Sequence, residues 1–283
     1  MKVIHNVSDK QIYLRELRIT SNKTIGFIPT MGALHDGHIS LVEQSVKNND
    51  ITVVSVFVNP RQFNDKSDFE NYPVNHQRDL DLLDKAGCNL VFLPSADDIY
   101  KNFVGFNMDF NGLDKIYEGE FRPGHFQGVV DIVYRLFEIV NPHKAYFGQK
   151  DFQQLAIIKL MTKLANFDIE IVSCPIVREK SGLAMSSRNL RLSQEQFKNA
   201  ANIYKLLIVI ANKLKVGDDT DKHSKYFIDE IEKISDMKAE YCVFCNPESL
   251  VSVKKINKNS EIIMCVAVWC GKIRLIDNII LVF

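Results

Sequence analysis

The stretch FIPTMGALHDGHISLVEQSV, residues 27–46, starts as an apolar strand and continues as an amphipathic helix. The helical pattern starts near His35, and the turn before it contains Gly32. His35 and His38 are spaced as His-x-Gly-His around Gly37. A strand that leads into a helix through such a turn is typical of a parallel sheet covered by helices, and this stretch therefore predicts an α/β fold.

The same alternation continues along the chain. Near-continuous apolar strands are expected at 25–29, 51–58, 89–93 and 144–148, and helices at about 38–47, 76–86, 125–140 and 151–165. The helix expected at 125–140 has an apolar stripe at helical spacing, formed by Val129, Val133, Leu136 and Val140. Ligands of such sheets bind at the carboxyl ends of the strands, so the loops after these strands are the candidate site.

The pattern changes after residue 177. We expect a long helix with Ser193 as its N-cap, a second helix near 221–235, and strands at 238–245, 262–269 and 273–282. The sequence therefore predicts two domains, residues 1–177 with the parallel sheet and residues 178–283 as a smaller α+β domain.

Composition limits the possible functions. The chain has 283 residues, of which 46% are hydrophobic, so it has enough apolar material for substantial cores. Lys plus Arg and Asp plus Glu number 35 each, and this balance argues against a nucleic-acid or membrane-surface partner. No apolar run is long enough to cross a bilayer, and the first residues lack a signal-peptide pattern. We expect a soluble cytoplasmic protein.

Six cysteines are too few for a disulfide framework. Cys242, Cys245, Cys265 and Cys270 offer four thiols for a zinc site, but they fall in strand-like runs and their spacing differs from that of a double C-x-x-C. We interpret them as buried packing residues.

Three interpretations of His35 and His38 stay open when the residues are taken alone. The two histidines bind a metal, contact an anion at the helix N-terminus, or cap and pack. A metal is the least favoured, because helical zinc ligands are spaced i, i+4 and no Cys or Glu accompanies the pair.

Two other strand ends carry polar residues. Gln62 follows the strand at 51–58, and Lys150 and Asp151 follow the strand at 144–148. Lys150 suits phosphate binding, whereas Asp151 is expected to hold a cation or to cap the next helix. Because these ends face one crevice of a parallel sheet, the sequence predicts a polar, cationic site there.

Five motifs together resemble one family, the pantoate–β-alanine ligases. They are PTMGALHDGH, VNPRQF, RPGHFQGV, FGQKDFQQ and GLAMSSRN, in the family's order, and the similarity continues to GKIRLIDNI near the C-terminus. The His-x-Gly-His pair alone resembles the wider nucleotidyltransferase superfamily, whose second signature is a Met-Ser loop like that at Met185 and Ser186.

The resemblance implies a Rossmann-like domain with a lid-like C-terminal domain. It implies an enzyme that joins pantoate to β-alanine with ATP, through a pantoyl adenylate, and releases AMP and pyrophosphate. A homodimer, Mg²⁺ and the cytoplasm are the usual setting of the family.

The resemblance also implies the roles of residues. His38 is the proton donor, with His35 beside it on the phosphates, and Lys150 completes the catalytic set. Gln62 and Gln154 match the pantoate-binding glutamines, and Gln62 also lies near β-alanine. Asp151 and Asp79 are candidate Mg²⁺ ligands. ATP binding is assigned to Met31, Gly32, Ala33, Leu34, His35, Asp36, Gly37, His38, Gly148, Gln149, Lys150, Asp151, Val177, Met185, Ser186, Ser187 and Arg188.

Arg122 and His125 are expected to contact phosphate or to line the wall of the site. Trp269 departs from the family's usual smaller or polar residue, and we expect it in packing or at a subunit contact. Two functions compete with the ligase, namely a nucleotidyltransferase without a second acceptor site and a non-catalytic RNA-binding relative. The balanced charge argues against the RNA-binding alternative.

Overall fold

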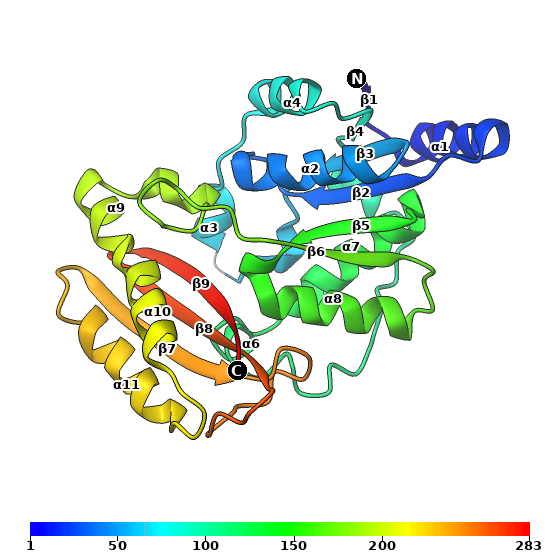
Figure 1. Cartoon of the computed structure of the whole chain (residues 1–283). Helices are drawn as coiled ribbons and strands as arrows, with labels where there is room; N and C mark the ends of the chain where they lie inside the picture. The colour runs from blue at the N-terminus through cyan, green and yellow to red at the C-terminus, as the bar shows by residue number, and fades with distance from the viewer. Residues whose placement is uncertain (65) are drawn as a thin grey trace. The chain divides into compact units, whose positions relative to one another are not determined.

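The computed structural model describes residues 1–64 and 66–283, with the side chains of residues 12, 17–21 and 67 outside that description. The chain divides into two compact units (Figure 1). Unit 1 comprises Met1–Gln149 and Gln153–Pro175, and unit 2 comprises Lys150–Phe152 and Ile176–Phe283. The assignment of substrate binding to one domain and a lid role to the other stays a prediction.

Unit 1 is built on a six-stranded sheet, and this sheet is parallel, as the sequence predicted. The strand order is β1 (Lys2–Ile4), β4 (Leu90–Phe92), β3 (Ile51–Val56), β2 (Ile25–Thr30), β5 (Lys144–Gly148) and β6 (Glu170–Cys174). The strands β3 and β5 lie on opposite sides of β2, so the strand order reverses direction there. This reversal places a ligand crevice at the carboxyl end of β2.

Successive residues of the strand β2 pack into two different cores, one on each face of the sheet. Ile28 packs with residues of α2 (Asp36–Asn48) and α4 (His76–Lys85), whereas Phe27 contacts Phe137 of α7 (His125–Val140). All three side chains are fully buried. A sheet covered on both faces accounts for the continuous apolar runs in the sequence.

The expected stripe of α7 is confirmed, since its four residues are at most 5% exposed. The remaining helices of unit 1 are α1 (Val7–Ser21), α3 (Lys66–Glu70), α5 (Ala96–Ile99), α6 (Glu118–Phe121) and α8 (Phe152–Leu164). The strands β1 and β6 and the helix α1 were not predicted. Both strands lie at the edges of the sheet and are only partly buried, and α1 has few apolar residues at helical spacing.

Unit 2 is an antiparallel sheet of β7 (Met237–Cys245), β8 (Glu261–Cys270) and β9 (Ile273–Val282), in that order. The helices α10 (Asn202–Lys213) and α11 (Thr220–Ile231) cover one face, and Leu207 and Phe227 are fully buried in that core. Ser193 caps a helix as expected, but that helix, α9 (Gln194–Ala200), ends before α10 begins. Asn202 donates to the carbonyl of Asn199 at 2.9 Å, a side-chain bond that competes with a continuous helix.

Candidate active site

The loop between β2 and α2 has two successive residues in the left-handed region. Gly32 has φ +81° and Ala33 has φ +50°. A Cβ atom at Gly32 would lie 3.0 Å from the carboxylate of Asp79, so glycine is required for both conformation and space. The conformation of Ala33 costs about 1 kcal/mol, which the surroundings must offset.

Asp79 supplies that support. Its carboxylate is 1% exposed and accepts the backbone N–H groups of Ala33 at 2.9 Å and Leu34 at 2.8 Å, one on each oxygen. The neighbouring Arg78 donates to the carbonyl of Leu34 at 3.1 Å. The family resemblance makes Asp79 a candidate Mg²⁺ ligand, but this geometry favours a role as the anchor of the loop.

The histidine pair follows directly on this loop. His35 is the N-cap of α2, and Nδ1 of His38 accepts the backbone N–H of His35 at 3.4 Å. The two ring centroids are 4.1 Å apart. An accepting Nδ1 places the proton of the neutral His38 ring on Nε2, which makes Nε2 a donor. Capping and anion contact are therefore compatible, because they use different nitrogens of the ring.

Gln62 lies beside the same loop. Its Nε2 is 2.9 Å from the sulfur of Met31, so two stretches that the sequence assigned to one site are in contact. The backbone carbonyl of Gln62 contacts Nδ1 of His125 at 2.8 Å. A Cβ atom at Gly128 would overlap the carbonyl of Arg61, so glycine lets α7 approach the turn that carries Gln62. The contact with His125 therefore supports the backbone of Gln62 from the side of α7.

The two successive glutamines of α8 differ in burial and in the hydrogen bonds of their side chains. Gln153 is buried and donates to the carbonyls of Leu113 at 2.6 Å and Ile116 at 2.9 Å. Gln154 is half-buried, and its side chain makes no hydrogen bond within the described part of the chain. The amide of Gln154 is therefore available to a ligand, whereas that of Gln153 is committed to the fold.

Lys150 follows β5 but groups with unit 2. Its carbonyl accepts a hydrogen bond at 3.0 Å from Asn278 of β9, and its ammonium lies 3.5 Å from the carboxylate of Asp151. Asp151 ends a 3₁₀ turn, Gln149–Asp151, before α8 starts at Phe152. Its carboxylate therefore has a cationic partner within the protein, the neighbouring ammonium.

The predicted Met-Ser loop lies in unit 2. The N–H of Met185 donates to the carbonyl of Val177 at 3.0 Å, which brings these two predicted residues together. Ser186 caps the 3₁₀ helix Ser187–Arg191 and accepts the N–H of Arg188 at 3.3 Å. The start of the loop is fixed by Arg178, which forms a double hydrogen bond with the buried Asp277 at 2.6 and 2.9 Å.

The four cysteines of β7 and β8 do not converge. Cys242 and Cys270 belong to the core beneath the helices, whereas the strand register puts Cys245 and Cys265 on the opposite face. Burial raises the pKa of Cys242 to about 12, which keeps the thiol protonated. Within residues 1–64 and 66–283, no three His, Cys, Asp or Glu side chains cluster in a way that holds a metal.

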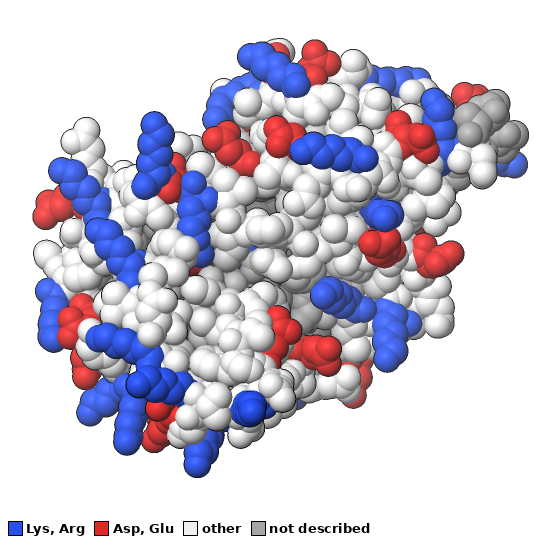
Figure 2. All heavy atoms as spheres, in the orientation of Figure 1, with Lys and Arg blue, Asp and Glu red and all other residues white. Residues whose placement is uncertain are grey.

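Charged side chains of both signs are interspersed on the face shown in Figure 2, in line with the balanced composition. Among the described helices, none is both long and apolar enough to cross a membrane.

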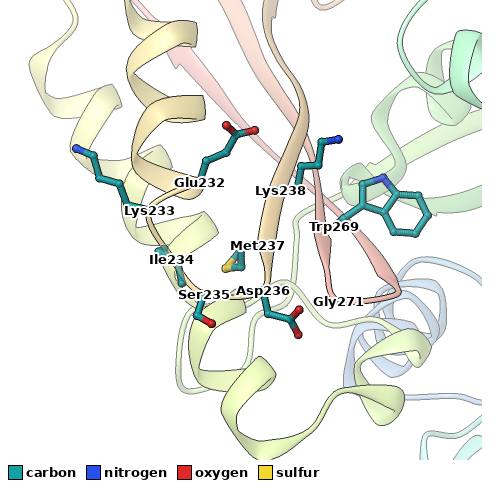
Figure 3. Close-up of a pocket in the computed structure, with 9 residues that line it drawn as sticks. All are labelled: Glu232, Lys233, Ile234, Ser235, Asp236, Met237, Lys238, Trp269 and Gly271. Atoms are coloured by element: carbon teal, nitrogen blue, oxygen red, sulfur yellow. The ribbon is translucent and has the colours of Figure 1, made fainter.

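A surface hollow of about 640 Å³ lies in unit 2, near the end of β8, and is lined by Met237, Lys238 and Trp269 among others (Figure 3). The indole N–H of Trp269 donates to Glu240 at 2.8 Å, and Arg274 also pairs with that carboxylate. None of the predicted substrate-binding residues lines this hollow.

Comparison with known proteins identifies the family. The model of the family described as pantoate-beta-alanine ligase matches residues 2–280. The chain belongs to the pantoate–β-alanine ligase family. It is 47% identical to the pantothenate synthetase of Bacteroides fragilis over 99% of this chain and 98% of that protein.

Solved structures of the family agree with the fold of this ligase. The pantothenate synthetase of Thermus thermophilus superposes with a TM-score of 0.89 at 36% identity, and 99% of each chain is covered. The Francisella tularensis ligase, solved in complex with beta-gamma ATP and beta-alanine, has a TM-score of 0.82 at 33% identity, with 99% of this chain and 97% of that chain covered. The predicted α/β fold and the predicted ligase function are both confirmed.

Sequence reasoning missed several residues around this site. Asn59 contacts Gln62, Tyr100 contacts Asn59, and Asn278 contacts Lys150. Asn59 lies within the VNPRQF motif and Asn278 within GKIRLIDNI, so motif membership was a usable signal for both. Tyr100 lies in no motif, and only the folded chain brings it to Asn59.

Proposed function

We propose that this pantoate–β-alanine ligase works through a pantoyl adenylate. A carboxylate and an amine form a salt at neutral pH and do not condense, so the acid must first acquire a leaving group. The pantoate carboxylate attacks the α-phosphate of ATP, and pyrophosphate departs. The amine of β-alanine then attacks the acyl carbon, and AMP departs. The residues of this chain have to bind phosphates, orient pantoate and exclude water.

The observation that carries this proposal is the histidine pair at the start of α2. The helix N-terminus and the loop backbone favour anionic oxygens. His38 is assigned as donor through Nε2, with the ring of His35 at 4.1 Å beside it. Donors fixed in place before the reaction stabilise the charge that gathers on departing pyrophosphate more than they stabilise bound ATP. A relative of known structure was solved with beta-gamma ATP and beta-alanine, which supports ATP as co-substrate here.

Lys150 and the loop Met185–Arg188 complete the proposed set of phosphate-binding residues. Lys150 provides a mobile positive charge for the phosphates, and Ser186, Ser187 and Arg188 provide hydroxyl and guanidinium donors. Gly148, Gln149 and Val177 offer backbone groups to the nucleotide. These assignments rest on the motifs, on the anchored backbone of Lys150 and on the contact between Met185 and Val177.

Pantoate binding is assigned to Gln62 and Gln154, and β-alanine binding to Gln62. A neutral amide orients a carboxylate and hydroxyl groups without the tight ion pair that an Arg side chain forms, so the carboxylate stays nucleophilic. The uncommitted amide of Gln154 supports its assignment.

The two candidate Mg²⁺ ligands do not form a complete site for the ion. Both oxygens of Asp79 accept backbone N–H groups, and Asp151 pairs with Lys150. We propose that Mg²⁺ enters with ATP, held mainly by the phosphates, with Asp151 as the more available of the two carboxylates. A homodimer and a cytoplasmic location are further proposals from the family resemblance.

The test is AMP formation from ATP with pantoate and β-alanine, each omitted in turn. The proposal predicts AMP and pantothenate in equal amounts only when all three substrates are present. A nucleotidyltransferase without an acceptor site would instead release pyrophosphate, keep the nucleotide conjugate as its end product and give no AMP when β-alanine is added.

A further inference from the structure

Asn59 is buried at the end of β3, with 1% of its surface exposed. Its side-chain oxygen accepts the backbone N–H of Arg61 at 3.2 Å, and its Nδ2 donates to the backbone carbonyl of Gly128 at 3.0 Å. A backbone N–H only donates and a carbonyl only accepts. These two contacts therefore determine which end of the Asn59 amide is oxygen.

The orientation of Gln62 follows from that of Asn59. The second N–H of Asn59 Nδ2 points at the side chain of Gln62 at 3.0 Å, so the atom that it meets must be the oxygen Oε1. The NH₂ group of Gln62 then faces away from Asn59 and toward Met31, whose sulfur is a weak acceptor. A ligand oxygen replaces that sulfur at little cost.

Tyr100 fills the remaining hydrogen-bonding position of the Asn59 side-chain amide. Its hydroxyl lies 2.6 Å from the oxygen of Asn59, where it can only donate, since that oxygen is an acceptor. With this bond, both N–H groups and both lone-pair positions of the Asn59 amide are in use within the protein. Burial raises the pKa of Tyr100, so its hydroxyl keeps its proton across the neutral range. The guanidinium of Arg61 stacks on the ring of Tyr100 at 3.9 Å and fixes its place.

We propose that Tyr100 is a positioning residue for pantoate recognition, acting through Asn59 to hold Gln62 with its NH₂ group toward the substrate. The site then selects an acid whose acceptor oxygens face the NH₂ group of Gln62. A ligand that presents only hydrogen-bond donors to that group is rejected. This inference rests on the proposed assignment of Gln62 to pantoate.

The test compares Tyr100→Phe, Gln62→Ala and the double variant. Loss of the Tyr100 hydroxyl leaves one lone pair of Asn59 unfilled and loosens the Gln62 amide. We expect the KM for pantoate to rise by about five- to tenfold in Tyr100→Phe, the size of one hydrogen bond, with the KM for ATP changed less than about twofold. In the Gln62→Ala background, Tyr100→Phe should add almost nothing. The matched control is Tyr134→Phe, because the ring of Tyr134 stacks on Phe106 and its hydroxyl bonds to Glu138 and not to Asn59, so both constants should stay unchanged.

Three results would overturn the proposal. They are an unchanged KM for pantoate in Tyr100→Phe, an equal rise for ATP and pantoate, and a full effect of Tyr100→Phe in the Gln62→Ala background. Calorimetric titration with pantoate gives the same comparison for variants that turn over too slowly. Failure of the proposed function is seen separately, as absence of pantothenate with the unchanged enzyme.

Discussion

His38 has two different nitrogens to use. Nδ1 accepts the N–H of His35 at the start of α2, and Nε2–H is the proposed donor to phosphate. A residue interpreted from sequence as either a cap or a ligand contact can thus serve both roles.

Replacement of His38 by Ala should slow pantoyl adenylate formation by about two to three orders of magnitude, the usual cost of one lost transition-state donor. Single-turnover assays with ATP and pantoate measure it. His38→Gln should recover part of the rate, because its amide offers an N–H near the same place. His5→Ala, at an exposed position, is the control. A folded His38→Ala enzyme with near-normal rate would remove His38 from catalysis.

Asp79 holds the same loop through its backbone. In Asp79→Asn one of the two backbone N–H groups of the loop faces an NH₂ group, and an unpaired buried donor costs about 1–3 kcal/mol. We expect a lower free energy of unfolding by urea denaturation and a raised KM for ATP. Asp81→Asn, on the exposed side of the same helix, should change neither. If Asp79→Asn instead left ATP binding intact and abolished Mg²⁺ dependence, the ligand interpretation would be restored.

At the scale of helices and strands, patterning predicted most of the parallel sheet. The runs at 51–58 and 144–148 were recognisable because strands buried on both faces are continuously apolar, and the stripe of α7 because an amphipathic helix repeats at helical spacing. The strands β1 and β6 were missed because they are the edge strands of the sheet and are only partly buried, so neither forms a continuous apolar run. The break between α9 and α10 coincides with a single side-chain bond from Asn202, which no window of composition detects.

The strand β9 holds the turn that bears Lys150. Asn278 is 4% exposed, and its side chain donates to the carbonyl of Lys150. Removal of that donor in Asn278→Ala should slow adenylate formation at saturating substrates by about tenfold, since the lysine loses its fixed backbone. The effect should vanish in a Lys150→Ala background. Asn257→Ala, exposed in the same unit, is the control. Equal effects of Asn278→Ala with and without Lys150 would indicate a general loss of stability.

For the whole molecule, the sequence assigns residues to the candidate site but does not assign the contacts that support them. The motifs place His35, His38, Gln62 and Lys150 at strand ends, where ligands of such sheets bind, and their roles stay predictions. The anchors Asp79 and Asn278 lie far along the chain from the residues that they hold. Such contacts depend on tertiary packing, so local sequence patterns do not reveal them.

The central claim is an adenylate that forms before the amine is needed. Exchange of labelled pyrophosphate into ATP tests it most directly, with pantoate present and β-alanine absent. We expect exchange that requires pantoate, is slowed in Lys150→Ala at saturating pantoate, and needs no amine. If the unchanged enzyme shows no exchange, or shows it only after β-alanine is added, the result would contradict an adenylate intermediate that forms with release of pyrophosphate.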